Sequence, residues 1–229
     1  MTKQERAART REAVIRSAAE VFDRDGFALS SLTSISTRAG VSNGALYFHF
    51  VNKNALAEAV EDEAVTALRR IAPPWGDATG PALQGLVDAT HTLALHMRED
   101  VILRAGFGLS ADTTWKGGGG SLRRYWAEWV GDGLAAAARQ GALADGVTLE
   151  DATVVIAATT LGFEALGRTD PQWFSGHMFT RLWRLLLPRL TTDQTVRAVA
   201  PADSCAGHGV GALGAAVSPR WWPVLGFAD

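Results

Sequence analysis

Residues 31–50, SLTSISTRAGVSNGALYFHF, predict two short helices joined by a tight turn. Leu32, Ile35 and Ala39 recur at helical spacing and give the first helix one apolar face. Gly40 follows the last apolar position, where a left-handed residue ends a helix without steric cost. Helix pairs of this kind lay their second helix in the major groove of DNA, so the stretch indicates a DNA-binding protein.

The second helix of this pair is predicted to present small and polar side chains outward. Ser42 is placed to cap it by accepting a backbone N–H, while Leu46 and Phe50 are expected to point inward. The outward side chains suit a duplex, because amides and hydroxyls meet base edges and phosphates and a methyl group meets thymine. They are Asn43, Ala45, Tyr47 and His49. The alternative is a structural helical hairpin whose polar residues only face water.

A further helix is predicted before this pair. Ile15, Ala18, Ala19 and Phe22 form an apolar stripe, and Gly26 is expected to end the helix. Basic side chains crowd its first half, where they are able to meet a phosphate backbone. They are Lys3, Arg6, Arg9, Arg11 and Arg16.

These features together resemble the N-terminal domain of the TetR family of one-component repressors. The matching residues are Phe22, Gly26-Phe27, Leu32, Ile35, Ala39-Gly40-Val41-Ser42, Gly44, Leu46-Tyr47-Phe48-His49-Phe50 and Lys53. The chain departs from the family at Ser36, where a small apolar core residue is usual, and at Asn43, where lysine is common. The predicted DNA-contacting residues are Arg11, Ser31, Thr33, Ser42, Asn43, Gly44, Ala45, Tyr47, His49 and Lys53. The central glycine of this set is expected to allow close approach of the helix to the duplex.

Charge is distributed unevenly along the 229 residues, whose formal net charge is −2. Residues 1–53 carry eight basic and five acidic residues, and the remainder carries 14 basic and 19 acidic residues. We therefore expect a DNA affinity that is local and strongly dependent on salt. The length suits a DNA-binding domain over 1–52, an effector-binding and dimerisation domain over 53–190, and a flexible tail over 191–229.

The rest of the chain predicts helices and no strand, so the expected fold class is all-α. Breaker residues at 72–80 and the four glycines ending at Gly120 predict loops, and Pro188 is expected to end the last helix. The last two helices are expected to pair with their two-fold mates in a homodimer. The predicted helices are Asn54–Ile71, Pro81–Glu99, Val101–Leu109, Ser121–Gln140, Glu150–Gly167 and Pro171–Leu187.

Several other functional classes are disfavoured by composition. One cysteine, Cys205, excludes an internal disulfide, and with five scattered histidines it offers no zinc site. No metal or cofactor is expected. The chain shows no nucleophile–histidine–acid cluster and no phosphate-binding glycine loop, so we do not expect an enzyme. Apolar windows are too short to cross a bilayer, and no signal peptide is recognised, so a soluble cytoplasmic protein without a membrane partner is expected. A plain helical scaffold is the remaining alternative.

The body contains one tryptophan-rich segment, Tyr125–Trp129, that suits an apolar ligand. Its alternative role is ordinary core packing. The segment Ile102-Leu103-Arg104-Ala105-Gly106 and Trp126 are similar to the γ-butyrolactone autoregulator receptors of actinomycetes, a TetR subfamily. The same subfamily resemblance extends to Phe22-Asp-Arg-Asp-Gly26 and Gly44–Phe50.

This resemblance implies a repressor of antibiotic or secondary-metabolite genes. A small lactone-like effector is expected to release it from a double-stranded DNA operator, with Trp126 packed on the ligand ring and Thr160 or Thr159 as a second contact. Further polar residues are able to face the ligand, although each is as easily a satisfied or exposed helix residue. They are Gln84, Asp88, His91 and Glu164. The alternative within the family is a sensor of a drug, an antibiotic or a fatty-acid-like ligand.

Overall fold

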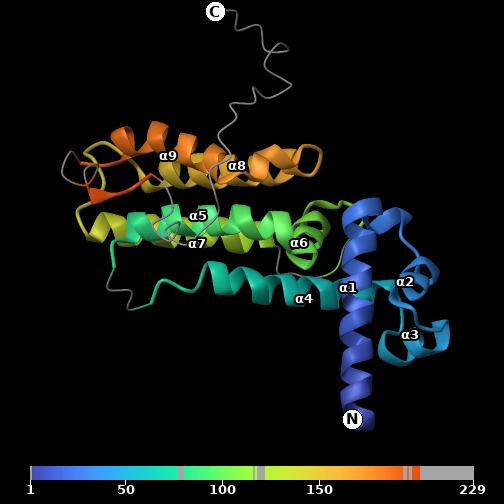
Figure 1. Cartoon of the computed structure of the whole chain (residues 1–229). Coiled ribbons are helices and arrows are strands. Elements are labelled where there is room, and N and C mark those ends of the chain that lie inside the picture. Colours follow the sequence, from blue (N-terminus) through green and yellow to red (C-terminus); the bar gives the residue numbers. More distant parts are fainter. Residues whose placement is uncertain are drawn as a thin grey trace, which may run out of the picture.

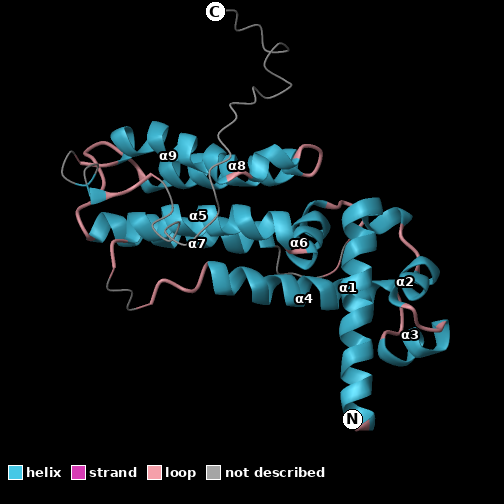
Figure 2. Ribbon diagram, viewed as in Figure 1, coloured by secondary structure: helices cyan, strands magenta, loops and turns pink. Residues whose placement is uncertain are grey.

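A computed structural model describes residues 2–76, 80–115, 117, 122–192, 195 and 198–201. Over these residues the secondary structure is helical apart from one isolated bridge between Leu143 and Thr191 (Figure 2). The all-α prediction is confirmed. A small N-terminal helical unit, the reader, lies at one end of a larger layered body (Figure 1).

The reader consists of α1 (Lys3–Leu29), α2 (Leu32–Ala39) and α3 (Asn43–His49). Gly26 interrupts α1 with a φ of +75°, as predicted, and a short turn then continues to Leu29. Gly40 ends α2 with a φ of +67°, in the left-handed region that glycine adopts without strain. The three helices close around a buried apolar core, which fixes how α3 is presented.

The body is built from helices in stacked layers. α7 packs on both α5 and α8, and α9 packs on α5, so α5 and α7 lie between α4 and an outer layer of α8 and α9 (Figure 1). The elements are α4 (Lys53–Ile71), α5 (Ala82–Glu99), α6 (Val101–Ala111), α7 (Leu122–Arg139), α8 (Leu149–Gly167), the 3₁₀ helix η1 (Pro171–Phe174) and α9 (Gly176–Leu190).

α4 belongs to both units. Leu56 and Val60, in its first half, are buried with the reader core, whereas Ala64 and Leu68 are buried with the body core. The domain boundary expected at residue 52 therefore lies between α3 and α4, but the reader core extends past it into the first half of α4. Gly106 of α6 lies so close to Ala64 that a Cβ at this glycine would overlap the alanine methyl group. The two helices thus hold the reader–body joint by close packing.

Two predictions about the last helices were wrong. The single helix predicted over Pro171–Leu187 is divided into η1 and α9, because Ser175 between them is extended. Pro188 does not end α9, which continues to Leu190. A proline removes only its own N–H donor. The helical hydrogen bonds continue after Pro188, because Thr191 N donates to Leu187 O at 3.1 Å. Pro81 precedes α5 as its cap and is not its first residue.

The segment predicted as a flexible tail from residue 191 begins as part of the body. Thr191 and Val199 are buried, and the backbone N–H of Ala200 donates to Gln84 Oε1 at 2.9 Å. Cys205 lies outside the described residues. Among the described residues no helix is long and apolar enough to span a membrane, and no group of side chains is arranged to hold a metal ion.

Candidate nucleic-acid interface and effector site

The short helix α3 lies on the surface of the reader. Ser42 Oγ accepts from Ala45 N at 3.2 Å, which caps the helix as predicted, and Leu46 and Phe50 are buried beneath it. Tyr47 is 55% exposed on the outward side. Because the inward side chains anchor the helix and the cap fixes its start, α3 presents a defined outward face.

The other predicted base-contacting positions lie on this face. Asn43 and Gly44 are exposed, and Ala45 is half-buried. A Cβ at Gly44 would meet only Ser42 Oγ, at 3.9 Å, so the chain itself leaves room for a side chain there. Any demand for glycine at this position must therefore come from a bound partner. His49 is half-buried, with its ring centroid 5.1 Å from that of Phe48 in an edge-to-face contact.

The remaining phosphate candidates flank α3. Ser31 caps α2 by accepting from Ser34 N at 3.1 Å, and the exposed Thr33 follows in its first turn. Arg11 of α1 is half-exposed, with its guanidinium 5.5 Å from the Phe50 ring centroid and 4.0 Å from Glu63 Oε1. A solvated pair of this length contributes little to stability, so the arginine is free to exchange partners.

Lys53 has partners that the sequence did not predict. Its Nζ donates to the carbonyl oxygens of Phe27 at 2.7 Å, Ser30 at 3.0 Å and Ala28 at 3.5 Å, and it lies 4.3 Å from the Phe27 ring centroid. An ammonium has three N–H donors, and here all three meet carbonyls of the reader. In this conformation the lysine therefore ties the end of α1 to the start of α4, and its predicted phosphate contact stays a prediction.

Two of the predicted effector contacts meet in the body core. The indole Nε1 of Trp126 donates to Thr160 Oγ1 at 2.7 Å, and both side chains are buried. Trp126 also stacks on Trp129, which stacks on Trp75, with ring centroids 5.4 and 4.7 Å apart. The stack places a polar donor–acceptor pair beside a large apolar surface, which is the combination that orients a small cyclic ligand.

Three of the other effector candidates, Thr159, Gln84 and His91, do not join this pair. Thr159 is half-buried and, one residue from Thr160, points about 100° away around α8. Gln84 binds Asp88 and the backbone of Ala200. His91 is buried and satisfied. Its Nδ1 lies 2.9 Å from Val87 O and its Nε2 lies 3.0 Å from Thr180 Oγ1. In this conformation Gln84 and His91 make their hydrogen bonds within the protomer, and their contact with an effector stays a prediction.

A chain of ion pairs runs from α8 to the reader. The buried Glu164, one turn after Thr160, accepts from Arg123 at 2.5 Å and from Arg168 at 2.6 Å. Arg168 lies 3.6 Å from Asp23 of α1, which accepts from Arg104 Nε of α6 at 2.9 Å. This series of ion pairs connects α8, which carries Thr160, with α1, which supports α3.

A buried carboxylate lies at the joint between reader and body. Glu61 of α4 is buried, and its Oε2 has no hydrogen-bond partner among the described residues. Burial raises the pKa of Glu61 to about 7, the indole of Trp115 opposes this, and the carboxylates of Asp62 and Glu58 add to it. Burial therefore favours the neutral form of the Glu61 carboxyl group.

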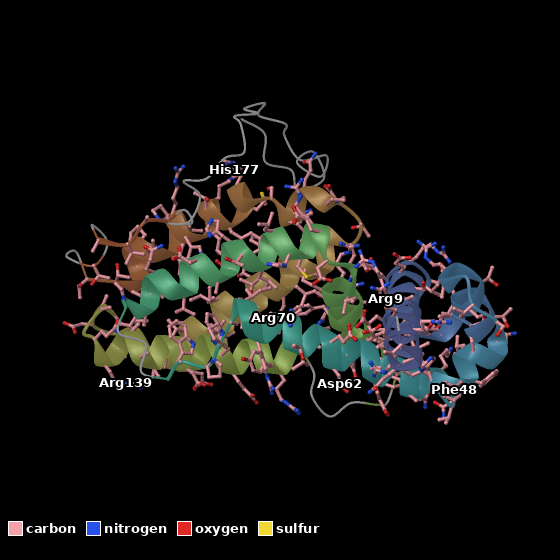
Figure 3. The ribbon with its side chains drawn as sticks, turned by 60° about the horizontal axis from the view of Figure 1, so that its bottom comes forward. Arg9, Phe48, Asp62, Arg70, Arg139 and His177 are labelled. Atoms are coloured by element: carbon pink, nitrogen blue, oxygen red, sulfur yellow. The ribbon has the colours of Figure 1, made fainter. Side chains whose placement is uncertain are left out.

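Sequence reasoning missed several of these residues. Phe48, 81% exposed at the outer end of the reader, carried no site prediction and entered the sequence analysis only as part of the family match (Figure 3). Trp75 was placed only in a loop, although its Nε1 donates to Trp129 O at 2.8 Å. The Asp23–Arg104 pair had a signal, because both residues belong to motifs that carried the subfamily resemblance.

These features define a protein class that comparison with known proteins supports. The family model described as bacterial regulatory proteins, tetR family, matches residues 14–60, which cover most of the reader and the first half of α4. The A-factor receptor protein of Streptomyces griseus is 30% identical over 211 residues, covering 88% of this chain and 71% of that relative. The chain belongs to the TetR family of bacterial regulatory proteins.

Within that family the chain resembles γ-butyrolactone receptors. A crystal structure of an ArpA-like γ-butyrolactone receptor superimposes with a TM-score of 0.74 at 26% identity, covering 86% of this chain and 96% of that one. CprB from Streptomyces coelicolor, studied in complex with its biological operator sequence, matches with a TM-score of 0.72 at 27% identity and the same coverage. The likeness therefore extends through the body as well as the reader.

Proposed function

We propose that this protein is a ligand-responsive transcriptional repressor that a small, lactone-like signalling molecule releases from its operator. The observation that carries the proposal is the outward presentation of α3, capped by Ser42 and anchored by Leu46, at the end of a body that resembles γ-butyrolactone receptors along most of its length. Its targets are genes of antibiotic or secondary metabolism, and it acts in the cytoplasm, where its operator lies.

The α3 face binds double-stranded DNA in the major groove. Asn43, Gly44 and Ala45 lie at the start of the helix, where a recognition helix contacts base edges. Tyr47 and Arg11 hold phosphates, and the exposed Ser31, Thr33 and Ser42 and the half-buried His49 supply further contacts to the duplex. Removing the Tyr47 hydroxyl should therefore weaken binding to all duplexes alike.

A second copy of the chain covers the outer layer of the body. α8 and α9 carry apolar side chains that are largely exposed in the protomer, with Leu185 73% and Val154 60% exposed. A homodimer through this layer buries them and sets two α3 helices in successive major grooves, about 34–36 Å apart. Val154→Glu should yield monomers in sedimentation experiments. Leu95→Glu, at an exposed position on α5 outside this layer, is the matched control and should remain dimeric.

The effector enters the region of Trp126 and Thr160. A ligand with a ring and a carbonyl oxygen replaces the hydroxyl of Thr160 as acceptor for the indole N–H, while the ring stacks on the tryptophan face. It is expected to open this contact, because both side chains are buried against each other in the present conformation.

The test is a binding selection followed by release. The purified protein selects duplexes from a random library, and gel shifts measure affinity for the enriched sequence as a function of salt. γ-Butyrolactones, furans and antibiotics are then titrated against the complex. Release by the lactones supports the proposal. Release only by antibiotics would make the protein a drug-sensing regulator, and failure to enrich any duplex would exclude a DNA-binding function.

A further inference from the structure

The two positions at which the sequence departs from the TetR pattern contact each other. Ser36 of α2 is 3% exposed, and its Oγ donates to Asn43 Oδ1 of α3 across 2.6 Å. Asn43 is exposed at the start of the recognition helix. A buried hydroxyl on one helix therefore holds an exposed side chain at the start of the next.

The length of this contact indicates the orientation of the amide group. Hydrogen bonds from a hydroxyl to an oxygen span about 2.5–3.0 Å, whereas those from an amide nitrogen begin near 2.7 Å. The single proton of Ser36 has a second acceptor, Thr33 O, at the longer distance of 3.0 Å. The shorter contact takes the proton, so Asn43 Oδ1 faces inward and its NH₂ group faces outward.

We propose that Ser36 is a positioning residue that makes Asn43 a donor-only contact to the operator, an inference that rests on the proposed DNA-binding function. With Oδ1 held, the outward NH₂ group binds hydrogen-bond acceptors: purine N7, guanine O6, thymine O4 or a phosphate oxygen. Cytosine, whose major-groove edge presents only an amino donor, is rejected, and adenine is accepted only through N7. An asparagine without this tether rotates its amide and tolerates both kinds of edge.

Ser36→Ala isolates the tether. Alanine keeps a small side chain at a buried position, so the fold of α2 is preserved while the hydroxyl is lost. We expect operator affinity to fall roughly five-fold, the order of one hydrogen bond. Asn43→Ala should lose as much or more, and the double variant should lose no more than Asn43→Ala alone. Thr37→Ala, at an exposed hydroxyl on the same helix, is the matched control and should bind as the parent does.

The decisive measurement is base preference, which a purely structural role would not change. Duplex selections with the parent and Ser36→Ala should show an acceptor-bearing base at one position of each half-site, and this preference should relax in the variant. If the contact is to purine N7, 7-deazapurine at that position removes the coupling between Ser36 and Asn43. If it is to a phosphate, base preference stays the same and a single neutral methylphosphonate removes the coupling.

Three results would overturn the inference. Additive losses in the double variant would show that Ser36 does not act through Asn43. A parent preference for cytosine N4 or adenine N6 donors at this position would mean that the amide is turned the other way. Unchanged affinity and preference in Ser36→Ala would leave the hydroxyl without a role in binding. Failure of the parent to bind any duplex would instead refute the DNA-binding function itself.

Discussion

Replacing Lys53 with methionine separates a structural role from a DNA contact. Hydrogen bonds to a charged group contribute about 1.5–3 kcal/mol. The Phe27 carbonyl keeps a second donor, the Ser30 hydroxyl at 2.6 Å, which limits the loss there. A cation at the first position of α4 opposes the helix dipole, so its removal returns about 0.3–1 kcal/mol. We expect Lys53→Met to lower the free energy of unfolding by about 2 kcal/mol.

The assay combines denaturation with the salt dependence of binding. Urea unfolding followed by circular dichroism measures the loss of stability. Each phosphate neutralised by a cation adds about 0.9 to the slope of log affinity against log salt, so a carbonyl-bound Lys53 should leave the slope unchanged. Arg70→Met removes the same charge from an exposed site on α4 and should cost less than about 1 kcal/mol. A shallower salt slope with parental stability would refute the structural role and restore the phosphate contact.

Three other substitutions test the reader, the effector site and the joint. Tyr47→Phe should weaken binding several-fold on specific and non-specific duplexes alike, as measured by gel shift, because the phosphate hydrogen bond proposed for its hydroxyl is lost; a loss confined to one sequence would contradict this. Trp126→Phe keeps an aromatic ring but removes the donor to Thr160, so operator binding should persist while release by lactone fails; parental dose dependence would make the tryptophan core packing alone. Glu61 has a folded-state pKa near 7 against about 4.5 unfolded, so its contribution lowers stability as pH rises between these values, by at most about 3 kcal/mol. Glu61→Gln should therefore be more stable than the parent at pH 8 and similar at pH 4.5, and equal stability at pH 8 would show that the carboxylate is solvated.

The reader was predictable because its signals are local. The cap at Ser42, the left-handed Gly40 and the spacing of Ile35 and Leu46 each act over a few residues, and each is confirmed. The role of Lys53 was not predictable in this way. Its partners lie 23 to 26 residues earlier, and they converge on it only because Gly26 turns the end of α1 toward α4.

In the effector region too, some features were predictable from the sequence and others depend on how distant helices pack. The resemblance singled out Trp126 and Thr160, which are 34 residues apart and hydrogen-bonded. It gave no means of choosing between Thr159 and Thr160, because that choice depends on the rotation of α8 against α7. His91 is satisfied by α9, a contact that depends on how two distant helices pack. Polar residues on amphipathic helices therefore remain ambiguous until their neighbours are known.

The free energy needed to shift the conformational equilibrium limits how a ligand near Trp126 is able to move the reader. Shifting a two-state balance from 1:99 to 99:1 takes about 5.5 kcal/mol of differential affinity. The Asp23 ion pairs are partly exposed, and pairs of this kind contribute about 1 kcal/mol or less each, so they cannot supply that difference alone.

The end of α4 offers a second connection. Tyr125 and Trp129, on either side of Trp126 on α7, donate to the carbonyls of Ala72 and Pro73 at 2.7 and 2.6 Å. A ligand that displaces Trp126 from Thr160 shifts these donors as well, because all three aromatic residues lie on one helix. α4 is then loosened at its body end through hydrogen bonds, while its reader end remains fixed by Lys53. Release is therefore expected to be a movement of α4 with the reader as one unit.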